Sequence, residues 1–235
     1  MMSDSELGTI EFVRSPRATH IHVRILPSGL KVSLPSVSTR EQALEFIESI
    51  RAKLLKKQAD IGKKLQKNPV HIDENTPLQT LTFKVVACVR QRENIHFSLK
   101  NNILSIEYPL HANCAEKRTQ ESFWQGISYF LKKEAKRILP ERTKQLAQQH
   151  GFQFADVKIQ SSKTRWGSCS GKQNINLSFY LLLLPYHLVD YVILHELCHT
   201  REMNHGVNFW RWMDKVTDNK SKEFRAELKK YHMPQ

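Results

Sequence analysis

The stretch 185-PYHLVDYVILHELCH-199 decides the fold of this chain. It is too apolar for a solvent-exposed ribbon and predicts a helix buried in the core. His195 and His199 are four residues apart, so both imidazoles lie about 40° apart around the helix axis and can converge on one ion. Glu196 projects beside them, where its carboxylate can accept a proton from a metal-bound water without becoming a ligand. The stretch therefore predicts a metal-binding helix with Glu196 as general base.

The identity of the metal is inferred from the cost of burial and from the ligand type. An HExxH pattern also arises by chance on exposed helices, but two histidines and a carboxylate within an apolar helix are costly to bury without a partner. A bound cation removes that cost. Neutral imidazoles without a thiolate cluster favour zinc, with manganese, iron and cobalt as alternatives. We therefore expect Zn2+ as the cofactor.

A catalytic zinc site has three protein ligands and one open position, so a third ligand is required. His205 follows His199 by six residues. Asn204 and Gly206 beside it can adopt the backbone angles that turn a side chain back toward the helix. The competing ligand is Glu223, which would come from a later helix, as in thermolysin-like enzymes. We predict a three-histidine site completed by His205.

The four cysteines are scattered without CxxC spacing, at Cys88, Cys114, Cys169 and Cys198. This pattern argues against disulfides. Cys198 lies inside the metal helix but is poorly angled to share the ion with its neighbour His199, and a thiolate ligand would close the site to catalysis. We therefore expect Cys198 to be a core residue.

Strand patterns fill the N-terminal half of the chain. Residues 18–35 alternate apolar and polar on both sides of Pro27-Ser28-Gly29, as in a hairpin, and a helix pattern follows from 38 to about 60. Residues 80–108 predict two or three further strands. No internal repeat is apparent in the sequence.

Helices dominate the second half. Residues 116–149 predict a long helix with a break or kink at Pro140 and a stop at Gly151. A strand and then a strand–turn–strand unit are expected between this helix and the metal helix.

Together these patterns predict an α+β fold, in which the metal-binding helix packs with a small mixed sheet and further helices. We expect a flexible N-terminus at 1–17 and a single domain at 18–235. That domain comprises a strand-rich N-terminal part, 18–110, and a helical part with the metal site, 116–235.

The chain is strongly basic, with 36 Lys and Arg against 23 Asp and Glu, a formal net charge of +13 and a pI near 9.7. Such a surface attracts nucleic acid and other polyanions, and the stretches 53–67 and 132–142 would form the basic footprint. A solvated surface without a specific partner explains the charge equally well.

Neither the N-terminal residues nor the most apolar stretch of the sequence is typical of a membrane protein. The N-terminal residues lack the apolar core of a secretory signal, and the apolar stretch 181–198 is interrupted by proline and charged residues. We expect a cytoplasmic protein without a membrane span.

Several motifs occur in a fixed order along the chain: RWGSC at 165–169, NINLSF at 174–179, DYVILHELCH at 190–199, NH at 204–205 and FW at 209–210. In this order, and from about residue 18 to 215, the sequence resembles the YgjP-like metallopeptidase family. The resemblance implies a zincin-like fold, related distantly to the SprT-type and Wss1-type proteases. It also implies zinc ligands at His195, His199 and His205, with Glu196 as base.

Three functional hypotheses follow. The first is zinc-dependent hydrolysis of a peptide or protein substrate. The second keeps the site but changes the substrate to a nucleotide or another phosphoanhydride. The third adds nucleic-acid binding through the basic surface, which would bring protease chemistry to bound targets.

Arg165 is a further candidate catalytic residue, because a guanidinium can stabilise an oxyanion or bind a carboxylate or phosphate. Alternatively, Arg165 and Trp166 brace a strand against the metal helix, with Gly167 permitting a close backbone approach. One of His187, Asp190 and Tyr191 could hold the second nitrogen of a metal-binding histidine, but each alone is more simply explained by a structural role. Aromatic residues so close after a metal helix could line a substrate cleft, but core packing is the first expectation for Phe209, Trp210 and Trp212.

Overall fold

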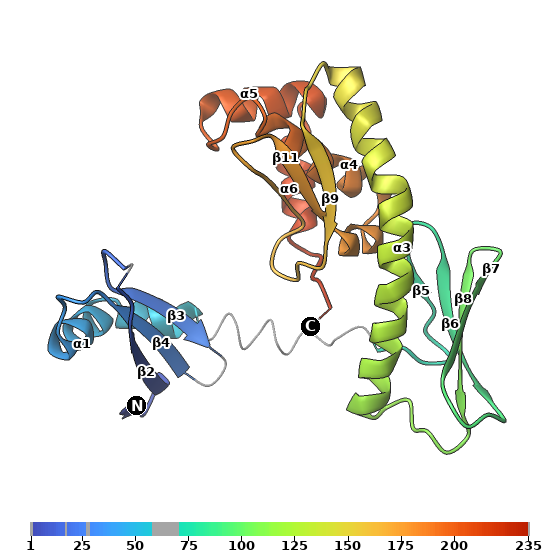
Figure 1. The fold of residues 1–235 in the computed structure, drawn as a ribbon, viewed down its shortest axis with the longest axis horizontal. Helices are drawn as coiled ribbons and strands as arrows, with labels where there is room; N and C mark the ends of the chain where they lie inside the picture. Colours follow the sequence, from blue (N-terminus) through green and yellow to red (C-terminus); the bar gives the residue numbers. More distant parts are fainter. Residues whose placement is uncertain (1, 17, 27–28, 58–70, 235) are drawn as a thin grey trace. The chain divides into compact units, whose positions relative to one another are not determined.

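The computed structural model describes residues 2–16, 18–26, 29–57 and 71–234 (Figure 1). Contacts within the chain divide it into two compact units, Met1–Asn68 and Pro69–Gln235, which are described separately below. The fold is a mixed α+β arrangement of small sheets and helices, as predicted. The predicted organisation into one domain at 18–235 stays a prediction.

The N-terminal unit is a four-stranded sheet with one helix. Its strands are β1 (Met2–Asp4), β2 (Gly8–Arg14), β3 (His22–Leu26) and β4 (Gly29–Leu34), in the order β1-β2-β4-β3. The antiparallel pair β3–β4 confirms the predicted hairpin, whose turn at Pro27-Ser28 lies outside the described residues. Helix α1 (Arg40–Ser49) begins with a capping box in which Thr39 and Gln42 bond each other's backbone.

The N-terminus differs from the flexible extension that we expected at 1–17. Strands β1 and β2 lie in this range, and Leu7 and Ile10 are buried in the core of the unit. Strand β2 pairs in parallel with β4, about twenty residues further along. Such a non-local pairing leaves little signal in a short window of sequence. The expected helix end near residue 60 and most of the basic stretch 53–67 lie outside the described residues.

The second unit begins with another four-stranded sheet. It contains β5 (Leu78–Gln79), β6 (Lys84–Arg90), β7 (His96–Lys100) and β8 (Ile103–Pro109), in the order β5-β6-β8-β7. The strands predicted at 80–108 are thereby confirmed. Asn101 and Asn102, with φ of 49° and 60°, form the tight turn between β7 and β8. Asparagine tolerates this left-handed backbone better than most residues, which suits it to such a hairpin turn.

The two sheets share one topology, although no repeat is apparent in the sequence. In both, the outer pairs are antiparallel and the central pair is parallel: β2 with β4, and β6 with β8. A helix follows each sheet. Few residues are shared, among them Ile-His at 21–22 and 95–96, because many apolar and polar residues satisfy the same strand pairing.

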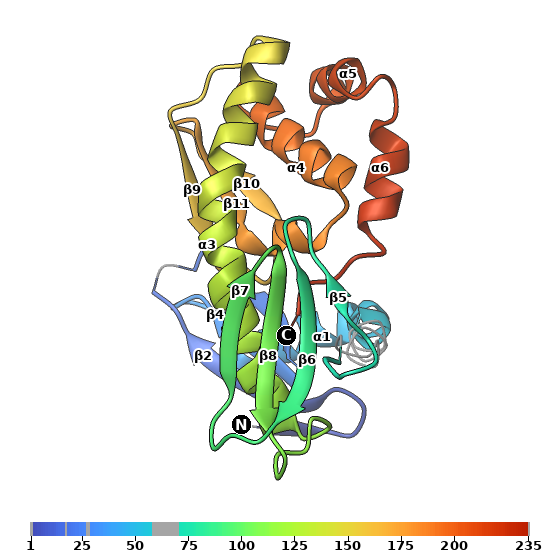
Figure 2. The same cartoon turned by 90° about the vertical axis from the view of Figure 1, so that its right-hand side faces the viewer.

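Helix α3 (Lys117–His150) is 34 residues long and runs along the length of the second unit (Figures 1 and 2). It continues through Pro140 without the predicted break, because buried residues such as Leu131 and Leu146 hold it on both sides of the proline. It ends at Gly151, whose φ of 68° is the left-handed stop that the sequence predicts. Near its start, Phe123 packs on Tyr108 of β8, with ring centroids 5.3 Å apart.

The C-terminal part contains a three-stranded sheet and the remaining helices. Strands β9 (Asp156–Gln160), β10 (Gly167–Cys169) and β11 (Asn174–Ser178) lie in the order β10-β11-β9. A 3-10 turn η1 (Phe179–Leu183) then leads to helices α4 (Tyr186–Cys198), α5 (Val207–Val216) and α6 (Ser221–Leu228). This order confirms the predicted strand, strand–turn–strand and buried helix.

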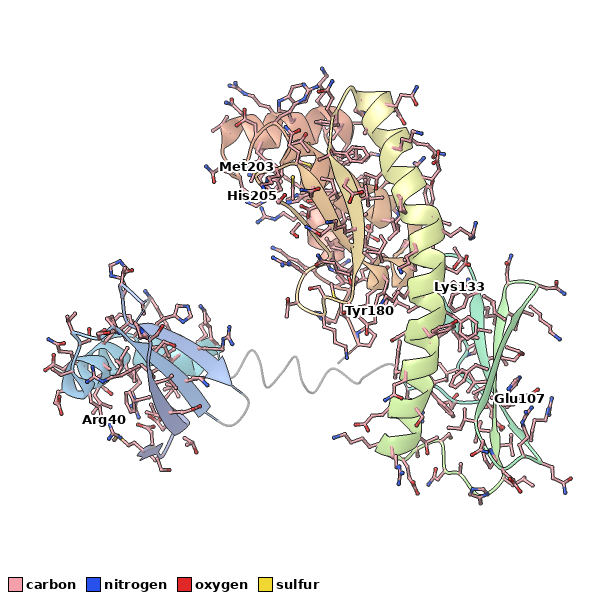
Figure 3. All side chains as sticks on the ribbon, viewed as in Figure 1. Arg40, Glu107, Lys133, Tyr180, Met203 and His205 are labelled. Carbon is pink, nitrogen blue, oxygen red and sulfur yellow. The ribbon has the colours of Figure 1, made fainter. Side chains whose placement is uncertain are left out.

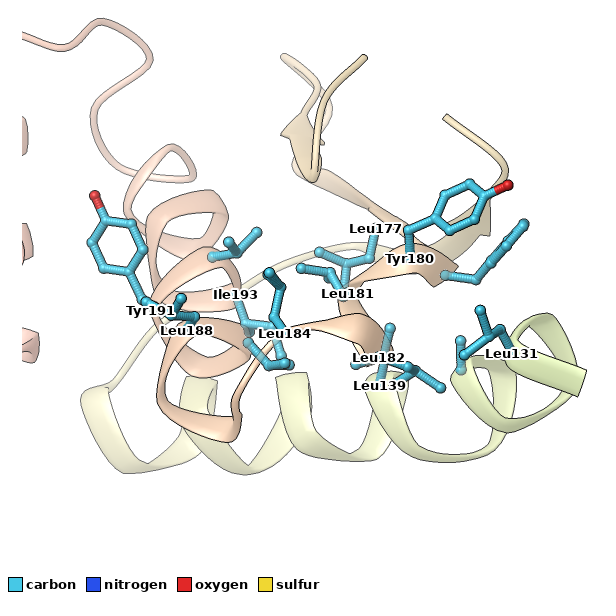
Figure 4. Close-up of a cluster of buried hydrophobic side chains, with 14 of the residues drawn as sticks. Leu131, Leu139, Leu177, Tyr180, Leu181, Leu182, Leu184, Leu188, Tyr191 and Ile193 are labelled. Atoms are coloured by element: carbon cyan, nitrogen blue, oxygen red, sulfur yellow. The ribbon is translucent and has the colours of Figure 1, made fainter. Parts of the chain in front are cut away.

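Leucines bury α4 in the core. Leu182 of η1 and Leu184 just after it lie between α3 and α4, where they meet Leu131 and Leu139 from α3 and Leu188 from α4 (Figure 4). All five are nearly inaccessible to solvent. The apolar run before the metal helix is therefore the core that fixes the helix in place. Within the described part of the chain, no helix has the length and apolar composition that a membrane span requires.

Candidate metal centre

Three imidazoles converge at the C-terminal end of α4. His195 and His199 come from α4, and His205 comes from the loop that precedes α5 (Figure 3). Nε2 of His205 lies 3.0 Å from Nε2 of His195, and one ring nitrogen from each of the three histidines lies within 4.8 Å of the others. Two nitrogens that each lie about 2.1 Å from a tetrahedral zinc ion would be about 3.4 Å apart. The spacing therefore fits a single metal ion.

The tautomer of His199 is fixed by the backbone. Its Nδ1 lies 3.0 Å from the carbonyl oxygen of Glu202, so Nδ1 carries the proton and donates it to this oxygen. The lone pair of the other nitrogen, Nε2, then faces the cluster. A hydrogen bond of this kind orients a metal-binding ring and raises its basicity.

Burial favours the neutral form of His195 and His199. It is the main cause that lowers the pKa of His195 to about 3, followed by the charges that His199 and His205 would carry. The pKa of His199 is also lowered, again chiefly by burial. A neutral imidazole is the form that binds a metal. His205 is exposed, so the cluster is open to solvent on this side.

Phe209 of α5 forms the floor beneath the three rings. It is fully buried, with ring centroids 4.9 Å from His195, 4.5 Å from His199 and 4.7 Å from His205. On His199 it stacks at an interplanar angle of 29°. Phe209 thus restricts the orientations of all three rings, which confirms the core role expected for it.

Glu196 lies against strand β10. Only 5% of its surface is exposed, and burial raises the pKa of its carboxyl to about 7. The charge of Arg165 and a hydrogen bond from the backbone N–H of Cys169 oppose this shift. The approach depends on Gly167, because a Cβ atom there would lie 2.8 Å from Cγ and Oε1 of Glu196. The expected close backbone approach at Gly167 is therefore confirmed.

Family comparison agrees with this geometry. The model of the YgjP-like family, described as a metallopeptidase domain, matches residues 19–231. The chain belongs to the YgjP-like metallopeptidase family. It is therefore a metallohydrolase of the metallopeptidase type, and its family implies a metal cofactor and a peptide or protein substrate.

Two solved structures are similar over part of this YgjP-like chain. The metallopeptidase zymogen abylysin of Pyrococcus abyssi is 26% identical and covers 37% of this chain and 89% of its own, with a TM-score of 0.35. The zymogen jannalysin of Methanocaldococcus jannaschii is 22% identical and covers 38% of this chain and 92% of its own, with the same TM-score. No curated protein compared with the chain matches it.

The remaining candidate residues of this YgjP-like chain lie outside the group of three converging ligand atoms. Glu223, the alternative ligand, is exposed on α6 and is not part of the group of converging ligand atoms. Cys198 is fully buried, and burial raises the pKa of its thiol to about 12. This burial agrees with the core role expected for Cys198. Arg165 is exposed, and its charge acts on Glu196.

Two of the three candidate outer-shell residues before His195 have partners outside the cluster, in agreement with the structural role expected for each. Asp190 pairs with Arg142 of α3 through two bonds of 2.8 and 2.6 Å, and His187 contacts Glu227 at 2.9 Å. The third, Tyr191, packs its ring 6.2 Å from that of His195. Instead, the backbone carbonyl of Glu202 fills this role for His199. Every residue has such a carbonyl, so no sequence signal could have identified it.

Proposed function

We propose that this chain is a zinc-dependent peptidase in which His195, His199 and His205 hold one zinc ion and Glu196 is the general base. The observation that carries this proposal is the convergence of three imidazoles on one point, next to a buried carboxyl. When bound, zinc polarises the scissile carbonyl and lowers the pKa of water.

Glu196 moves the proton. Its carboxylate takes a proton from the attacking water and passes it to the leaving amine. A carboxyl whose pKa is about 7 suits both halves of this task near neutral pH, because it binds and releases protons with similar ease. Burial against β10 also limits its rotation, which keeps it oriented toward the water.

Arg165 is proposed as a second catalytic group, which stabilises the negative oxygen that develops on the substrate. Support comes from its charge, which acts on Glu196, and from its position two residues before Gly167. It forms no ion pair with another described residue, so its guanidinium is free to bind an anion.

Strand β10 offers a place for an extended substrate. It is an edge strand, bonded on one side to β11 and to no other strand in the described part of the chain. Because Gly167 of β10 touches Glu196, a peptide added as a further strand beside β10 would pass the catalytic base. Strand addition lets backbone hydrogen bonds bind peptides of varied sequence.

Metal analysis tests the site directly. Elemental analysis of protein purified without added metal is expected to give about one zinc per chain. The zinc should be lost in His205→Ala and kept in Glu223→Ala, which removes the exposed carboxylate. Absence of metal from the wild-type protein would overturn the proposal.

Substrate assays then test the chemistry. A fluorogenic peptide library should be cleaved by the zinc-loaded protein and not by Glu196→Gln, which retains the metal. The same two proteins incubated with nucleoside triphosphates test the phosphoanhydride alternative. Turnover of nucleotides, but not peptides, would replace the proposed function with that alternative.

Nucleic-acid binding through 132–142 stays a prediction. Lys132, Lys133 and Lys136 of this stretch are exposed on α3, whereas Arg137 is paired with Glu134 at 2.7 Å. Binding to a random duplex that weakens steeply with salt, and weakens further when these three lysines are replaced by glutamine, would support it.

A further inference from the structure

Helix α6 packs on the side of α4 opposite strand β10. Figure 2 shows α4 between β10 on one side and α6 on the other, and α4 packs against both. The base Glu196 faces β10, so α6 lies at the other wall of the site. Residues of α6 that point toward the cluster can therefore contact a substrate without disturbing the base.

Arg225 of α6 is such a residue. Its guanidinium carbon lies 4.9 Å from the centroid of the Trp210 ring. Trp210 in turn stacks on His205, with ring centroids 6.1 Å apart and an interplanar angle of 29°. Arg225 is thus connected to a proposed zinc ligand through one aromatic ring. Its charge also reaches Tyr191, whose ring lies beside His195.

The guanidinium of Arg225 has no acidic partner among the described residues. Arg142, by contrast, is paired with Asp190. Two carboxylates of α5 and α6 are engaged elsewhere: Glu227 contacts His187, and Asp214 accepts a hydrogen bond from Ser221. Stacking on an aromatic ring uses the face of a guanidinium and leaves its N–H groups free to bind a carboxylate.

We propose that Arg225 binds a carboxylate of the peptide substrate and gives the site a preference for acidic peptides. This inference rests on the proposed function, because it names the substrate class of the same site. The carboxylate has two possible sources, an acidic side chain near the scissile bond or the C-terminus of the peptide. Either would form a bidentate pair with the planar guanidinium.

Four matched peptides test the inference. Starting from a peptide that the zinc-loaded wild-type protein cleaves, one set carries Glu or Gln next to the scissile bond, and each is made with a free or an amidated C-terminus. Steady-state assays give kcat and KM for each peptide. The wild-type protein should prefer the acidic member of one pair by about tenfold in kcat/KM, mainly through KM.

Two variants and one control assign this preference to Arg225. In Arg225→Gln the ratio of acidic to neutral kcat/KM should fall to about one, and in Arg225→Lys it should be intermediate, since a lysine keeps the charge without the planar fork. Lys230→Gln removes the same charge from an exposed position just after α6 and should keep the wild-type ratio. Zinc content and circular dichroism check that each variant is folded.

The outcomes separate the two proposals. If the wild-type protein cleaves all four peptides equally, or if Arg225→Gln keeps the wild-type ratio, Arg225 does not select the substrate although the protein is a peptidase. If the zinc-loaded protein cleaves no peptide, the proposed function itself fails and this inference fails with it. The pair in which the preference appears shows whether the side chain or the C-terminus supplies the carboxylate.

Discussion

Gly167 of β10 and Glu196 of α4 are in contact, so close that a Cβ atom on residue 167 would lie 2.8 Å from Cγ and Oε1 of the glutamate. The backbone at Gly167 is not in the left-handed region that otherwise demands glycine. Glycine is therefore required here because Glu196 leaves no room for a Cβ atom, and not because of the backbone conformation. The strand can hold the proposed base in position only because residue 167 has no side chain.

Gly167→Ala is expected to lower kcat by about 100-fold, because a displacement of about 1 Å in a catalytic group has an effect of this size. Zinc content should be unchanged, since the histidines do not touch the strand at this point. Gly171→Ala is the matched control, because a Cβ atom there has no neighbour within 4 Å. Equal kcat values for the two variants would show that the contact does not position the base.

Phe209→Ala is expected to destabilise the protein by about 3–5 kcal/mol, because it removes a fully buried ring from beneath three histidines. Urea denaturation of the metal-free protein measures the change in the free energy of unfolding. Val207→Ala lies two residues earlier in α5, where the side chain is 70% exposed, and should change stability by less than about 0.5 kcal/mol. A loss as small in Phe209→Ala as in this control would contradict the packing described here.

Asp190→Ala is expected to cost about 2 kcal/mol, because it breaks a two-bond ion pair between α4 and Arg142 of α3. Zinc content should not change, since Asp190 contacts no histidine of the cluster. The double variant Arg142→Ala/Asp190→Ala should lose less than the sum of the single variants. Loss of zinc in Asp190→Ala would instead assign this residue to the support of a metal ligand.

The N-terminal sheet should weaken in acid through Asp4. Hydrogen bonds from the backbone N–H groups of Leu7 and Glu6, and then from Arg51, lower the pKa of Asp4 from 3.8 to about 2. Because the folded state holds this carboxylate ionised, its stabilising effect is complete above about pH 4 and is lost as the pH falls toward about 2.

Amide exchange measures this effect in the whole protein. Protection factors of the amides in β1 and β2, corrected for the intrinsic exchange rate at each pH, should fall between about pH 4 and about pH 2. In Asp4→Asn, protection should be lower at pH 5 and should change less across this range. An identical decline in both proteins would rule out Asp4 as its source.

Local patterns were enough to predict the metal helix and most of the secondary structure around it. The apolar run before His195 predicts burial, and α4 is buried. Likewise, alternation predicts the hairpin β3–β4, and Gly151 predicts the end of α3. These features depend on residues within a few positions of each other. The predicted break at Pro140 is absent because packing along the whole of α3 stabilises the helix through the proline, and a kink there stays a prediction.

The sequence by itself determined the proposed metal ligands His195 and His199, because two histidines four residues apart share one face of a helix. It also determined the family, through motifs that lie in a fixed order. Only the tertiary structure decided which groups surround them. The carbonyl of Glu202, the Gly167 contact with Glu196, the stack of Arg225 on Trp210 and the repeated sheet topology all join segments that are separated by a turn or by many residues. Such pairings depend on the path of the chain in space, and a linear pattern does not encode that path.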